Sequence, residues 1–449
     1  MTMTISGFRC EPFISPSNHL LILVFMPEIM PFKGILYHPE LLKDADGLIC
    51  PPYDVISPAF QQQLYSRSPF NAIRLELPKE ADPYEAAALR LAEWLQAGEL
   101  QHDMEPAIYP YFQTFEDSDG VSHTRCGFFA AMRLHDFTDK KVLPHEKTLS
   151  GPKADRLNLF RKTKTNISSI FGLYADESKR VDRLMKSFAE ANEPVVDAEF
   201  QGVINRMWRI TDSSLVGQFQ QTLQERVVYI ADGHHRYDTG VNYRNERAAA
   251  NHSHTGEEPY NFILTYLANI HDEGLLIFPI HRLVHTLPGF DMVELRAALA
   301  ENFTLTDLHD RAELKCFFDQ ESSNYTYGVV TSGSVVGITL KSDPDTLVDP
   351  SRQEALKSLG LVLLHDLILG KLLGISQDAM AKQSNLLYVH DDREVFDAVE
   401  LGKVQVGFVV KPTTVAQVLA VSETGEVMPQ KSTFFYPKIM TGLVFNSIA

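Results

Sequence analysis

The sequence predicts an α+β fold in which a mixed β-sheet is flanked by helices. Strand-like runs occur in neighbouring pairs, such as residues 107–115 and 124–134, and helical segments separate these pairs. The connection between these two runs contains Asp-Gly, which is typical of a hairpin turn. A regular parallel α/β protein would instead alternate single strands with helices. Neither GxGxxG nor GxxxxGK[ST] is present, so the common nucleotide-binding α/β folds are not indicated.

The remaining elements follow from the spacing of apolar residues. Apolar residues three and four positions apart predict helices, and runs rich in β-branched and aromatic residues predict strands. The predicted helices cover residues 83–100, 178–193, 213–223, 235–250, 354–375 and 414–426. The predicted strands cover residues 194–200, 203–210, 226–230, 260–270 and 403–410. Ser213 is the expected N-cap of its helix, and residues 251–259 and 428–438 are expected loops.

The composition is that of a globular protein with an acidic surface. The chain has 449 residues, which is enough for two to three domains. Hydrophobic residues make up 44% and charged residues 22% of the sequence, and both values are ordinary for a globular protein. The net charge of −17 repels nucleic acid phosphates unless a basic patch overrides it. No run of lysine and arginine supplies such a patch, so we expect no nucleic acid partner.

Cysteine usage and the apolar segments predict a reduced, cytoplasmic protein without a membrane partner. The four cysteines are far apart and form no CxxC motif, which disfavours a disulfide framework or a zinc cluster. The apolar run 20–25 is too short to cross a bilayer. No basic segment and no cleavage site mark a signal peptide. We therefore interpret residues 1–25 as a poorly ordered extension and Met26 as close to the natural start.

The segment VVYIADGHHRYDTG, residues 227–240, joins a buried-type strand to a helix through polar and flexible residues. Gly233 allows the backbone to approach a ligand closely. The following helix directs N–H groups and the positive end of its dipole at the turn. Arg236 supplies donors that match a phosphate, and His234 and His235 can donate or relay protons. A solvated helix start is the alternative, but so many polar residues in succession after such a strand favour a phosphate site.

Asp232 is the acidic member of this turn. A carboxylate beside a phosphate is repulsive unless it holds a metal, orients a histidine or takes a proton. A metal site formed by Asp232, His234 and His235 is therefore an alternative. It is the weaker one, because the side chains of adjacent histidines diverge and no third histidine follows at helical spacing.

The segment VLPHEKTLSGPKADRL, residues 142–157, gathers charged residues in what two prolines and a glycine predict to be a loop. Glu146 is a candidate general base, and Lys147 and Lys153 are candidate phosphate partners. An exposed charged loop explains the segment equally well when it is taken alone.

Two further segments carry unusual polar residues. In residues 428–435, Lys431, Ser432 and Thr433 combine a cation with two hydroxyl groups near a proline. A surface turn explains this segment unless it lies beside the other two. In residues 50–57, CPPYDVIS, a stiff Pro-Pro pair exposes a tyrosine and an aspartate, but no chemistry follows from this segment alone.

Five conspicuous segments are spread along the chain: MPFKGILYHPE, PPYDVISP, LPHEKTLSGPKADRL, ADGHHRYDTG and KPTTVAQVLAVSETGEVMPQKSTFFYPK. Together they resemble the bacterial domain-of-unknown-function 1015 family, sometimes labelled SpoOJ/ParB-like, from about residue 26 to the C-terminus. The resemblance implies a ParB/sulfiredoxin-like core with insertions in residues 26–270. It also implies a C-terminal α/β region, residues 271–449, that contributes the loop 428–438 to the same cleft.

The order of these segments is also similar, more distantly, to that in archaeal ADP-dependent free-serine kinases. That family has Pro-His-Glu, then Asp-Gly-His-His-Arg after a strand, and Pro-Lys-Thr-Thr near its C-terminus. The corresponding segments here are residues 144–146, 232–236 and 429–433. The resemblance implies that Glu146 is the base acting on a hydroxyl group and that residues 232–236 hold nucleotide phosphates. It further implies that the C-terminal loop binds the seryl substrate or its phosphate.

Taken together, these observations predict a nucleotide-dependent phosphotransferase or phosphohydrolase acting on a small hydroxyl compound such as L-serine or phosphoserine. The expected catalytic residues are Glu146, Asp232 and His235. The expected nucleotide or phosphate ligands are Gly233, His234, Arg236, Lys147 and Lys153, and the expected substrate ligands are Lys431, Ser432 and Thr433. ADP or ATP with Mg²⁺ is the expected cofactor. The alternatives are a ParB-like nucleotide-binding switch without metabolic turnover, and a scaffold whose polar turn is a structural remnant.

Overall fold

The computed structural model describes residues 28–117, 119–148, 150–224 and 226–449. The expectation for residues 1–25 therefore lies outside the described residues. Within the described ranges, no helix combines the length and the apolar character that crossing a bilayer requires. The cysteines in these ranges, Cys50, Cys126 and Cys316, carry free thiols.

The larger of two main sheets has nine strands among the described residues, in the order β6-β11-β8-β12-β5-β4-β10-β9, with β1 paired to β5. These strands are β1 (Ile29–Met30), β4 (Tyr109–Glu116), β5 (Ser122–Arg133), β6 (Val142–Leu143), β8 (Ile170–Tyr174), β9 (Val196–Phe200), β10 (Val203–Met207), β11 (Val228–Asp232) and β12 (Phe262–Asn269). The pairs β11–β6 and β12–β8 are parallel. The expected hairpins β4–β5 and β9–β10 are antiparallel. The mixed sheet that the sequence predicts is therefore present.

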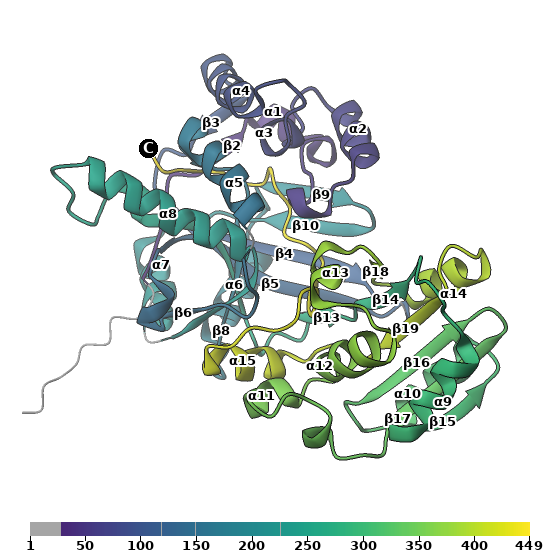
Figure 1. The fold of residues 1–449 in the computed structure, drawn as a ribbon. Helices are drawn as coiled ribbons and strands as arrows, with labels where there is room; N and C mark the ends of the chain where they lie inside the picture. Colours follow the sequence, from purple (N-terminus) through teal and green to yellow (C-terminus); the bar gives the residue numbers. More distant parts are fainter. Residues whose placement is uncertain (1–27, 118, 149, 225) are drawn as a thin grey trace, which may run out of the picture.

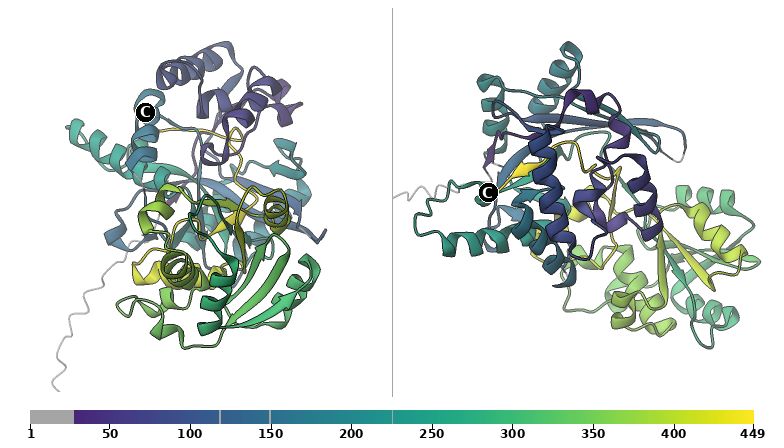
Figure 2. Two further views of the ribbon diagram at one scale, coloured as in Figure 1. Left: turned by 45° about the vertical axis from the view of Figure 1, so that its right-hand side comes forward. Right: turned by 90° about the horizontal axis from the view of Figure 1, so that it is seen from above.

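This sheet is buried on both faces. Phe128 and Phe129 are neighbours in β5 but belong to two different apolar clusters, because consecutive side chains of a strand point to opposite faces. Helices α6 (Arg180–Ala191), α7 (Ser213–Leu223) and α8 (His234–Ala250) contact the strands of this sheet, while α5 (Ser150–Thr163) packs on α8 and α4 (Pro83–Ala97) packs on α5. Helix α5 contacts both α4 and α8 (Figures 1 and 2).

Short elements of the N-terminal part lie over one end of the sheet (Figure 1). They are β2 (Ile35–Tyr37), α1 (Pro39–Leu42), η1 (Ala45–Gly47), η2 (Tyr53–Val55), α2 (Pro58–Arg67), α3 (Ile73–Glu76) and β3 (Leu100–His102). Strands β2 and β3 pair antiparallel, and the 3₁₀ turn η3 (Phe137–Asp139) follows β5.

The second main sheet is built from antiparallel pairs in the order β15-β17-β16-β19-β14-β18. Its strands are β14 (His281–Val284), β15 (Phe303–Leu308), β16 (Thr326–Thr331), β17 (Ser334–Leu340), β18 (Leu386–Val389) and β19 (Val406–Val410). The helical elements here are α9 (Met292–Asn302), α10 (Arg311–Gln320), η5 (Pro344–Thr346), α11 (Glu354–Lys357), α12 (Gly360–Leu363), α13 (Gln377–Lys382), α14 (Asp392–Glu400) and α15 (Val415–Thr424). A π-helix, η6 (Leu364–Leu372), follows α12 directly.

The end of the chain returns to the first sheet's part of the molecule (Figure 1, yellow). Strand β20 (Phe434–Tyr436) pairs with β13 (Leu276–Phe278), and β21 (Asn446–Ser447) pairs with β7 (Thr165–Asn166). Isolated bridges also join Phe445 to Ile35 and Thr441 to Cys50. These pairings bring the C-terminal segment beside residues from the beginning of the chain.

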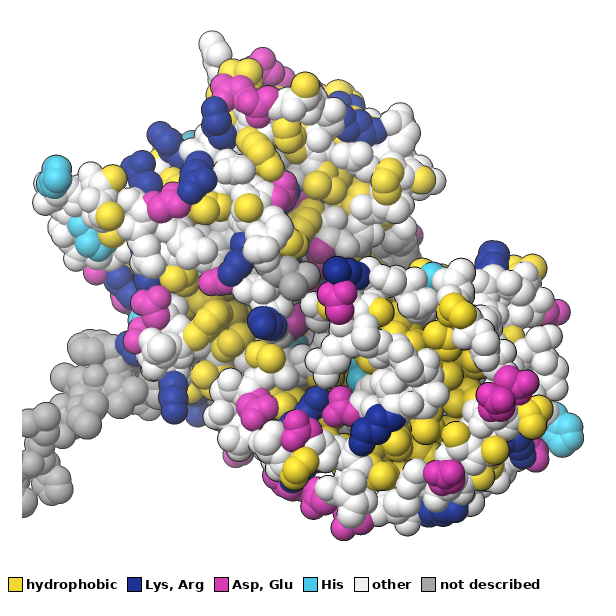
Figure 3. Space-filling model, viewed as in Figure 1, with side chains coloured by type: hydrophobic (Ala, Val, Ile, Leu, Met, Phe, Trp, Pro, Cys, Tyr) yellow, Lys and Arg dark blue, Asp and Glu magenta, His cyan; other side chains and the backbone are white. Residues whose placement is uncertain are grey.

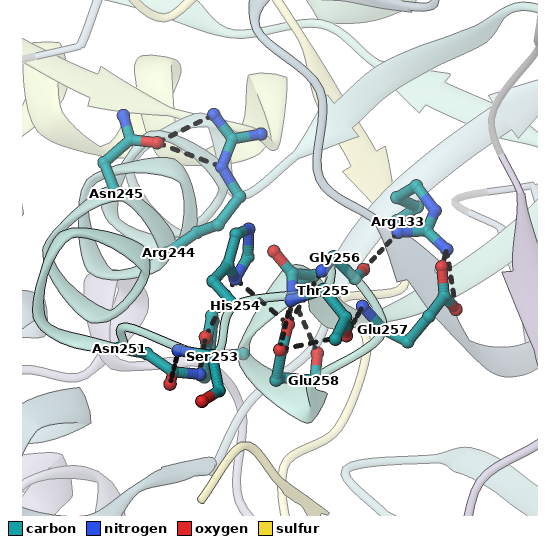
Figure 4. Close-up of polar contacts among 12 residues, drawn as sticks. Arg133, Arg244, Asn245, Asn251, Ser253, His254, Thr255, Gly256, Glu257 and Glu258 are labelled. Atoms are coloured by element: carbon teal, nitrogen blue, oxygen red, sulfur yellow. Dashed lines mark hydrogen bonds and ion pairs between the residues drawn. The ribbon is translucent and has the colours of Figure 1, made fainter.

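The loop after α8 fixes the far end of that helix (Figure 4). The carboxylate of Glu258 accepts hydrogen bonds from the backbone N–H groups of Thr255, at 2.6 Å, and Gly256, at 3.0 Å. Arg133 in β5 donates to the carbonyl of Gly256 and pairs with Glu257 at 2.9 Å. These contacts anchor the loop that follows α8 to strand β5.

The prediction of one long helix over residues 354–375 is wrong. The segment is divided into α11, α12 and η6, and Leu359 adopts an extended backbone conformation between the first two. At Gly360 a Cβ atom would lie 2.2 Å from the carbonyl oxygen of Asn324, and its own carbonyl accepts a hydrogen bond from Tyr327. This close tertiary contact competes with the helical hydrogen bonds and ends α11.

Three smaller expectations are also corrected. Asp212, not Ser213, caps α7, and its carboxylate accepts a hydrogen bond from Leu215 N–H. Much of residues 142–157 is helical rather than a loop, since α5 begins at Ser150. The segment 428–438 contains a short strand, β20, because its backbone finds a partner in β13.

Candidate functional site

The turn between β11 and α8 requires a glycine. Gly233 has a φ of 89°, which is a left-handed conformation that other residues rarely adopt. A Cβ atom at this position would lie 3.0 Å from Nε of Arg236. The turn therefore places the N-terminal end of α8, where backbone N–H groups lack helical partners, directly after the strand.

Asp232 lies between two cations. Lys438 Nζ is 2.7 Å from its Oδ1 atom, and Arg236 Nη2 is 2.7 Å from its Oδ2 atom. Burial by itself would raise the pKa of Asp232, but Lys438 and Arg236 together lower it well below its usual value. Asp232 is therefore ionised at neutral pH, and both of its oxygens hold cations in place.

The side chain of Arg236 is buried next to the turn. Its side chain is only 4% exposed. Besides Asp232, its guanidinium donates a hydrogen bond to the carbonyl of Ser169. The sequence predicts that the guanidinium of Arg236 is open to a phosphate. The structure instead buries this positive charge inside the protein.

Two neutral histidines connect the turn to residues 144–148. The backbone N–H of His145 donates to Nε2 of His234 at 3.2 Å, so the proton of His234 resides on Nδ1. His145 Nδ1 lies 2.8 Å from the carbonyl of Ile230 and donates to it, and His145 Nε2 accepts from the hydroxyl of Thr433 at 3.0 Å. Burial lowers the pKa of His145 to about 4 and that of His234 well below its ordinary value. Both imidazoles therefore remain neutral and hold fixed tautomers.

Glu146 lies at the edge of this pair. Its Oε2 atom is 3.9 Å from Nδ1 of His234, and a third of its side chain, 33%, is exposed. Burial raises the pKa of Glu146, and the charge of Asp232 adds to this effect, whereas Lys431 and Lys438 oppose it. The result is a partly exposed carboxyl group with a raised pKa among two lysines.

The other predicted residues of the turn and of α5 form a second group. Lys153 Nζ pairs with Asp238 at 2.8 Å, and Thr148 donates to the same carboxylate oxygen at 2.8 Å. Burial lowers the pKa of His235, and the nearby charge of Asp54 opposes this change while that of Lys153 adds to it. The charges of Asp54 and Lys153 therefore both act on the ionisation of His235. Asp54 comes from the 50–57 segment, for which sequence reasoning assigned no chemistry.

The predicted substrate loop is shaped by its own polar groups. The hydroxyl of Ser432 donates to the carbonyl of Pro429 at 2.6 Å, and the side chain is buried. The carbonyl of Lys431 accepts from Arg282 at 2.8 Å, and the Lys431 backbone has a φ of 57°. Ser432 thus supports the loop, while Lys431 and Thr433 contribute to the surroundings of Glu146 and His145.

Sequence reasoning assigned no role to Lys438 or to the residues that support the 50–57 segment. Arg156 lies 4.3 Å from the centre of the Tyr53 ring and 3.5 Å from the buried carboxylate of Glu76. Ser168 donates to the same Glu76 oxygen at 3.0 Å. The charged run in α5 and the C-terminal Tyr-Pro-Lys were visible signals, but their partners are distant in sequence.

Lys147 follows Glu146 directly in the chain. Its side chain is exposed and lines a cavity formed with the C-terminal part of the chain. For the alternative metal site, the described ranges contain no group of three or more histidine, cysteine, aspartate or glutamate side chains arranged to hold an ion.

The family model described as a protein of unknown function, DUF1015, matches residues 29–362. The chain therefore belongs to the DUF1015 family, whose description assigns no reaction. Comparison with the curated proteins finds no match.

Among solved structures, a free serine kinase in complex with AMP is 13% identical, covers 71% of this chain and 92% of its own, and gives a TM-score of 0.33. A conserved hypothetical protein from Pyrococcus furiosus is 14% identical over 70% of this chain and 92% of its own, with a TM-score of 0.33. A C-terminally truncated SbnI from Staphylococcus aureus is 9% identical over 70% of this chain and 85% of its own, with a TM-score of 0.32.

Proposed function

We propose that this protein is a nucleotide-dependent phosphotransferase in which Glu146 is the general base for a small hydroxyl compound. The observation that carries the proposal is the position of Glu146. Its carboxyl group is partly exposed, has a raised pKa, and lies 3.9 Å from His234 in the first turn of α8. A general base works best when its pKa is raised towards the working pH and when it lies beside the site of the reacting group.

The N-terminal end of α8 is the proposed phosphate site. Free N–H groups and the helix dipole favour an anion there, and Gly233 lets the backbone approach it. Arg236 and Lys438 supply positive charge from below through their contacts with Asp232. Lys431, whose charge acts on Glu146, completes the cationic surroundings.

The proposed reaction transfers one phosphoryl group. The acceptor hydroxyl loses its proton to Glu146, and its oxygen forms a bond to the terminal phosphorus of the nucleotide. The bond from that phosphorus to the bridging oxygen breaks, and the nucleotide leaves with one phosphate fewer. Phosphoryl transfer depends mainly on positioning and on neutralising charge, which this cluster of fixed cations is suited to provide. Hydrolysis of a phosphorylated compound would use the same groups with water as the acceptor.

ADP or ATP is the proposed donor, and Mg²⁺ is its usual companion. Mg²⁺ is commonly held by substrate phosphates and by only one or two carboxylates. Asp232 is unsuited to bind it because both of its oxygens contact cations. The described residues contain no group of three or more histidine, cysteine, aspartate or glutamate side chains arranged to hold an ion, so the nucleotide phosphates would supply most of the protein-independent ligands of Mg²⁺.

The test is incubation with ADP or ATP plus Mg²⁺, with and without L-serine, followed by mass detection of nucleotide and phosphorylated products. L-Serine comes first because the segments 144–146, 232–236 and 429–433 resemble those of the free-serine kinases. We expect a phosphorylated hydroxyl product that depends on both substrates. Nucleotide binding without any product would instead support the switch alternative. Absence of any thermal shift with nucleotide would support the scaffold alternative, because a ligand that binds the native state must stabilise it.

A further inference from the structure

A cavity of about 520 Å³ lies next to the candidate site. Its lining includes Lys147, which follows Glu146 in the chain, and Gln430, which precedes Lys431. Consecutive Cα atoms are only about 3.8 Å apart, so one edge of the cavity adjoins the proposed base. Figure 3 shows hydrophobic side chains around a hollow in this part of the molecule, near α12 and α13 in the view of Figure 1.

One side of the cavity is polar and carries unused donors. Lys147 makes no ion pair with any described residue, whereas Arg352 pairs with Asp366 at 3.0 Å. Nε2 of His365 accepts a hydrogen bond from Arg282 at 3.2 Å. The proton of His365 is therefore on Nδ1, for which the described residues supply no acceptor. An ammonium group and an imidazole N–H thus remain available to an anionic group.

The other side of the cavity is apolar and adaptable. It is lined by Leu356, Met380, Ala381, Val427, Met428 and Pro429. Methionine side chains are flexible and polarisable, so they can fit differently shaped apolar groups. A ligand with an apolar body would bury surface here that water otherwise covers.

The cavity wall includes the π-helix η6. His365 and Asp366 both come from this nine-residue element, and its end is marked by a hydrogen bond from Leu373 N–H to the Ile368 carbonyl at 3.0 Å. π-Helical turns are rare and occur frequently at functional sites. Arg282 links this wall to the proposed site, because it contacts both His365 and the carbonyl of Lys431.

The size of the cavity indicates the class of its ligand. Sites for drug-sized molecules and cofactors span roughly 300–1,000 Å³, and a three-carbon amino acid would leave most of this cavity empty. We propose that the cavity binds the phosphoryl acceptor, and that the acceptor is a hydroxycarboxylic acid with an apolar chain longer than that of serine. This inference rests on the proposed function. The carboxylate would lie at Lys147, the hydroxyl would face Glu146, and the chain would lie along Met380 and Met428.

A second cavity of about 530 Å³ does not offer the same features. Three of its cations already pair with acids that line it: Arg311 with Asp392, Arg393 with Asp391, and Lys315 with Asp119. Its lining also includes none of the residues that adjoin Glu146. The cavity beside Lys147 is therefore the better acceptor site.

The first experiment measures binding without turnover. Calorimetry on the full chain compares L-serine with racemic 3-hydroxybutyrate, 3-hydroxyhexanoate and 3-hydroxyoctanoate. If the chain enters the apolar side, affinity increases by roughly two- to fourfold per added methylene. Binding of L-serine at least as tight as that of 3-hydroxyoctanoate, or affinity independent of chain length, would overturn the inference.

Two variants locate this binding. Met380→Trp fills the apolar side and should abolish the dependence on chain length, whereas Leu387→Trp adds the same bulk at a 48% exposed position of β18 and should leave it intact. Lys147→Gln should lower the affinity for all the hydroxycarboxylates by about the same factor. It should leave the affinity for the corresponding 3-hydroxyamides unchanged. Lys382→Gln, which removes an exposed cation of α13, is the matched control. Retention of the chain-length dependence in a folded Met380→Trp variant would overturn the proposed location.

Product analysis with ADP or ATP separates this inference from the proposed function. Phosphorylation of the longer hydroxy acids in preference to L-serine supports both. Efficient phosphorylation of L-serine alone overturns the acceptor class but not the phosphotransferase. Failure to phosphorylate any of the compounds, although the longer acids bind in the cavity, overturns the acceptor role. In that case, nucleotide-dependent phosphorylation of another hydroxyl compound would still support the proposed phosphotransferase function.

Discussion

Lys438 Nζ lies 2.7 Å from Oδ1 of Asp232, although 206 residues separate them in the sequence. This contact joins the C-terminal segment to the end of β11 and fixes the charge beneath the proposed phosphate site. Arg236 holds the other carboxylate oxygen at 2.7 Å. The acid and its two cations thus form one unit in which each member restrains the others.

Lys438→Met should destabilise the protein at neutral pH by about 1.5–3 kcal/mol, which is typical of a lost hydrogen bond to a charged group. The lowered pKa of Asp232 contributes stability that is present above its unfolded-state pKa of about 4 and is lost as the pH falls through the lower folded-state pKa. The deficit of the variant should therefore shrink below about pH 4. Urea denaturation across this pH range measures the difference in the free energy of unfolding between the variant and the wild type. The control Lys403→Met, at an exposed lysine, should lose little stability. A stability deficit of Lys438→Met that is equal at all pH values would contradict the pairing with Asp232.

Glu146→Gln should lower kcat by about 10²–10⁴-fold, the usual contribution of a general base, and should leave nucleotide affinity nearly unchanged. The ionised form of Glu146 is the active one, and burial raises its pKa. Activity of the wild type should therefore rise with pH through a value above the ordinary glutamate pKa of about 4.3, and this rise should be missing in the variant. Glu105→Gln, at a remote exposed position, is the control. Wild-type turnover in Glu146→Gln would rule out this base.

Glu146→Gln should also change how stability depends on pH. Because the folded-state pKa of Glu146 is raised, the folded protein binds its proton more tightly than the unfolded chain does. The wild type therefore loses stability as the pH rises from the unfolded-state value through the raised folded-state value, and the glutamine variant does not. Unfolding in urea at pH 4 and pH 8 should show that the free energy of unfolding of the variant increases relative to that of the wild type at the higher pH. A constant difference would mean that the pKa is not raised.

Thr433→Val should destabilise the protein by about 1–3 kcal/mol, because it leaves the buried Nε2 atom of His145 without its hydrogen-bond donor. Thr433→Ser retains the hydroxyl group and should therefore lose much less stability. Chemical denaturation of the two variants side by side gives this difference. Equal stability of the serine and valine variants would show that the hydroxyl does not orient His145.

Local sequence was sufficient for most of the elements around the first sheet. The Asp-Gly hairpin joins β4 to β5, and the helix predicted from residue 235 is α8. These elements depend on turn residues and on apolar periodicity, which act over a few positions. The single helix predicted for residues 354–375 failed because its break at Leu359 and Gly360 results from contacts with Asn324 and Tyr327. Periodicity contains no information about such contacts.

The sequence by itself determined which residues have suitable chemistry: an Asp-Gly-His-His-Arg turn at the start of a helix, a Pro-His-Glu segment, and a basic hydroxyl-rich loop. Only the tertiary structure decided how these residues are used. It buried Arg236, turned the hydroxyl of Ser432 inward, and made Lys438 the partner of Asp232. The physical reason is that burial and ion pairing depend on distances through space, and these distances arise only when segments hundreds of residues apart pack together.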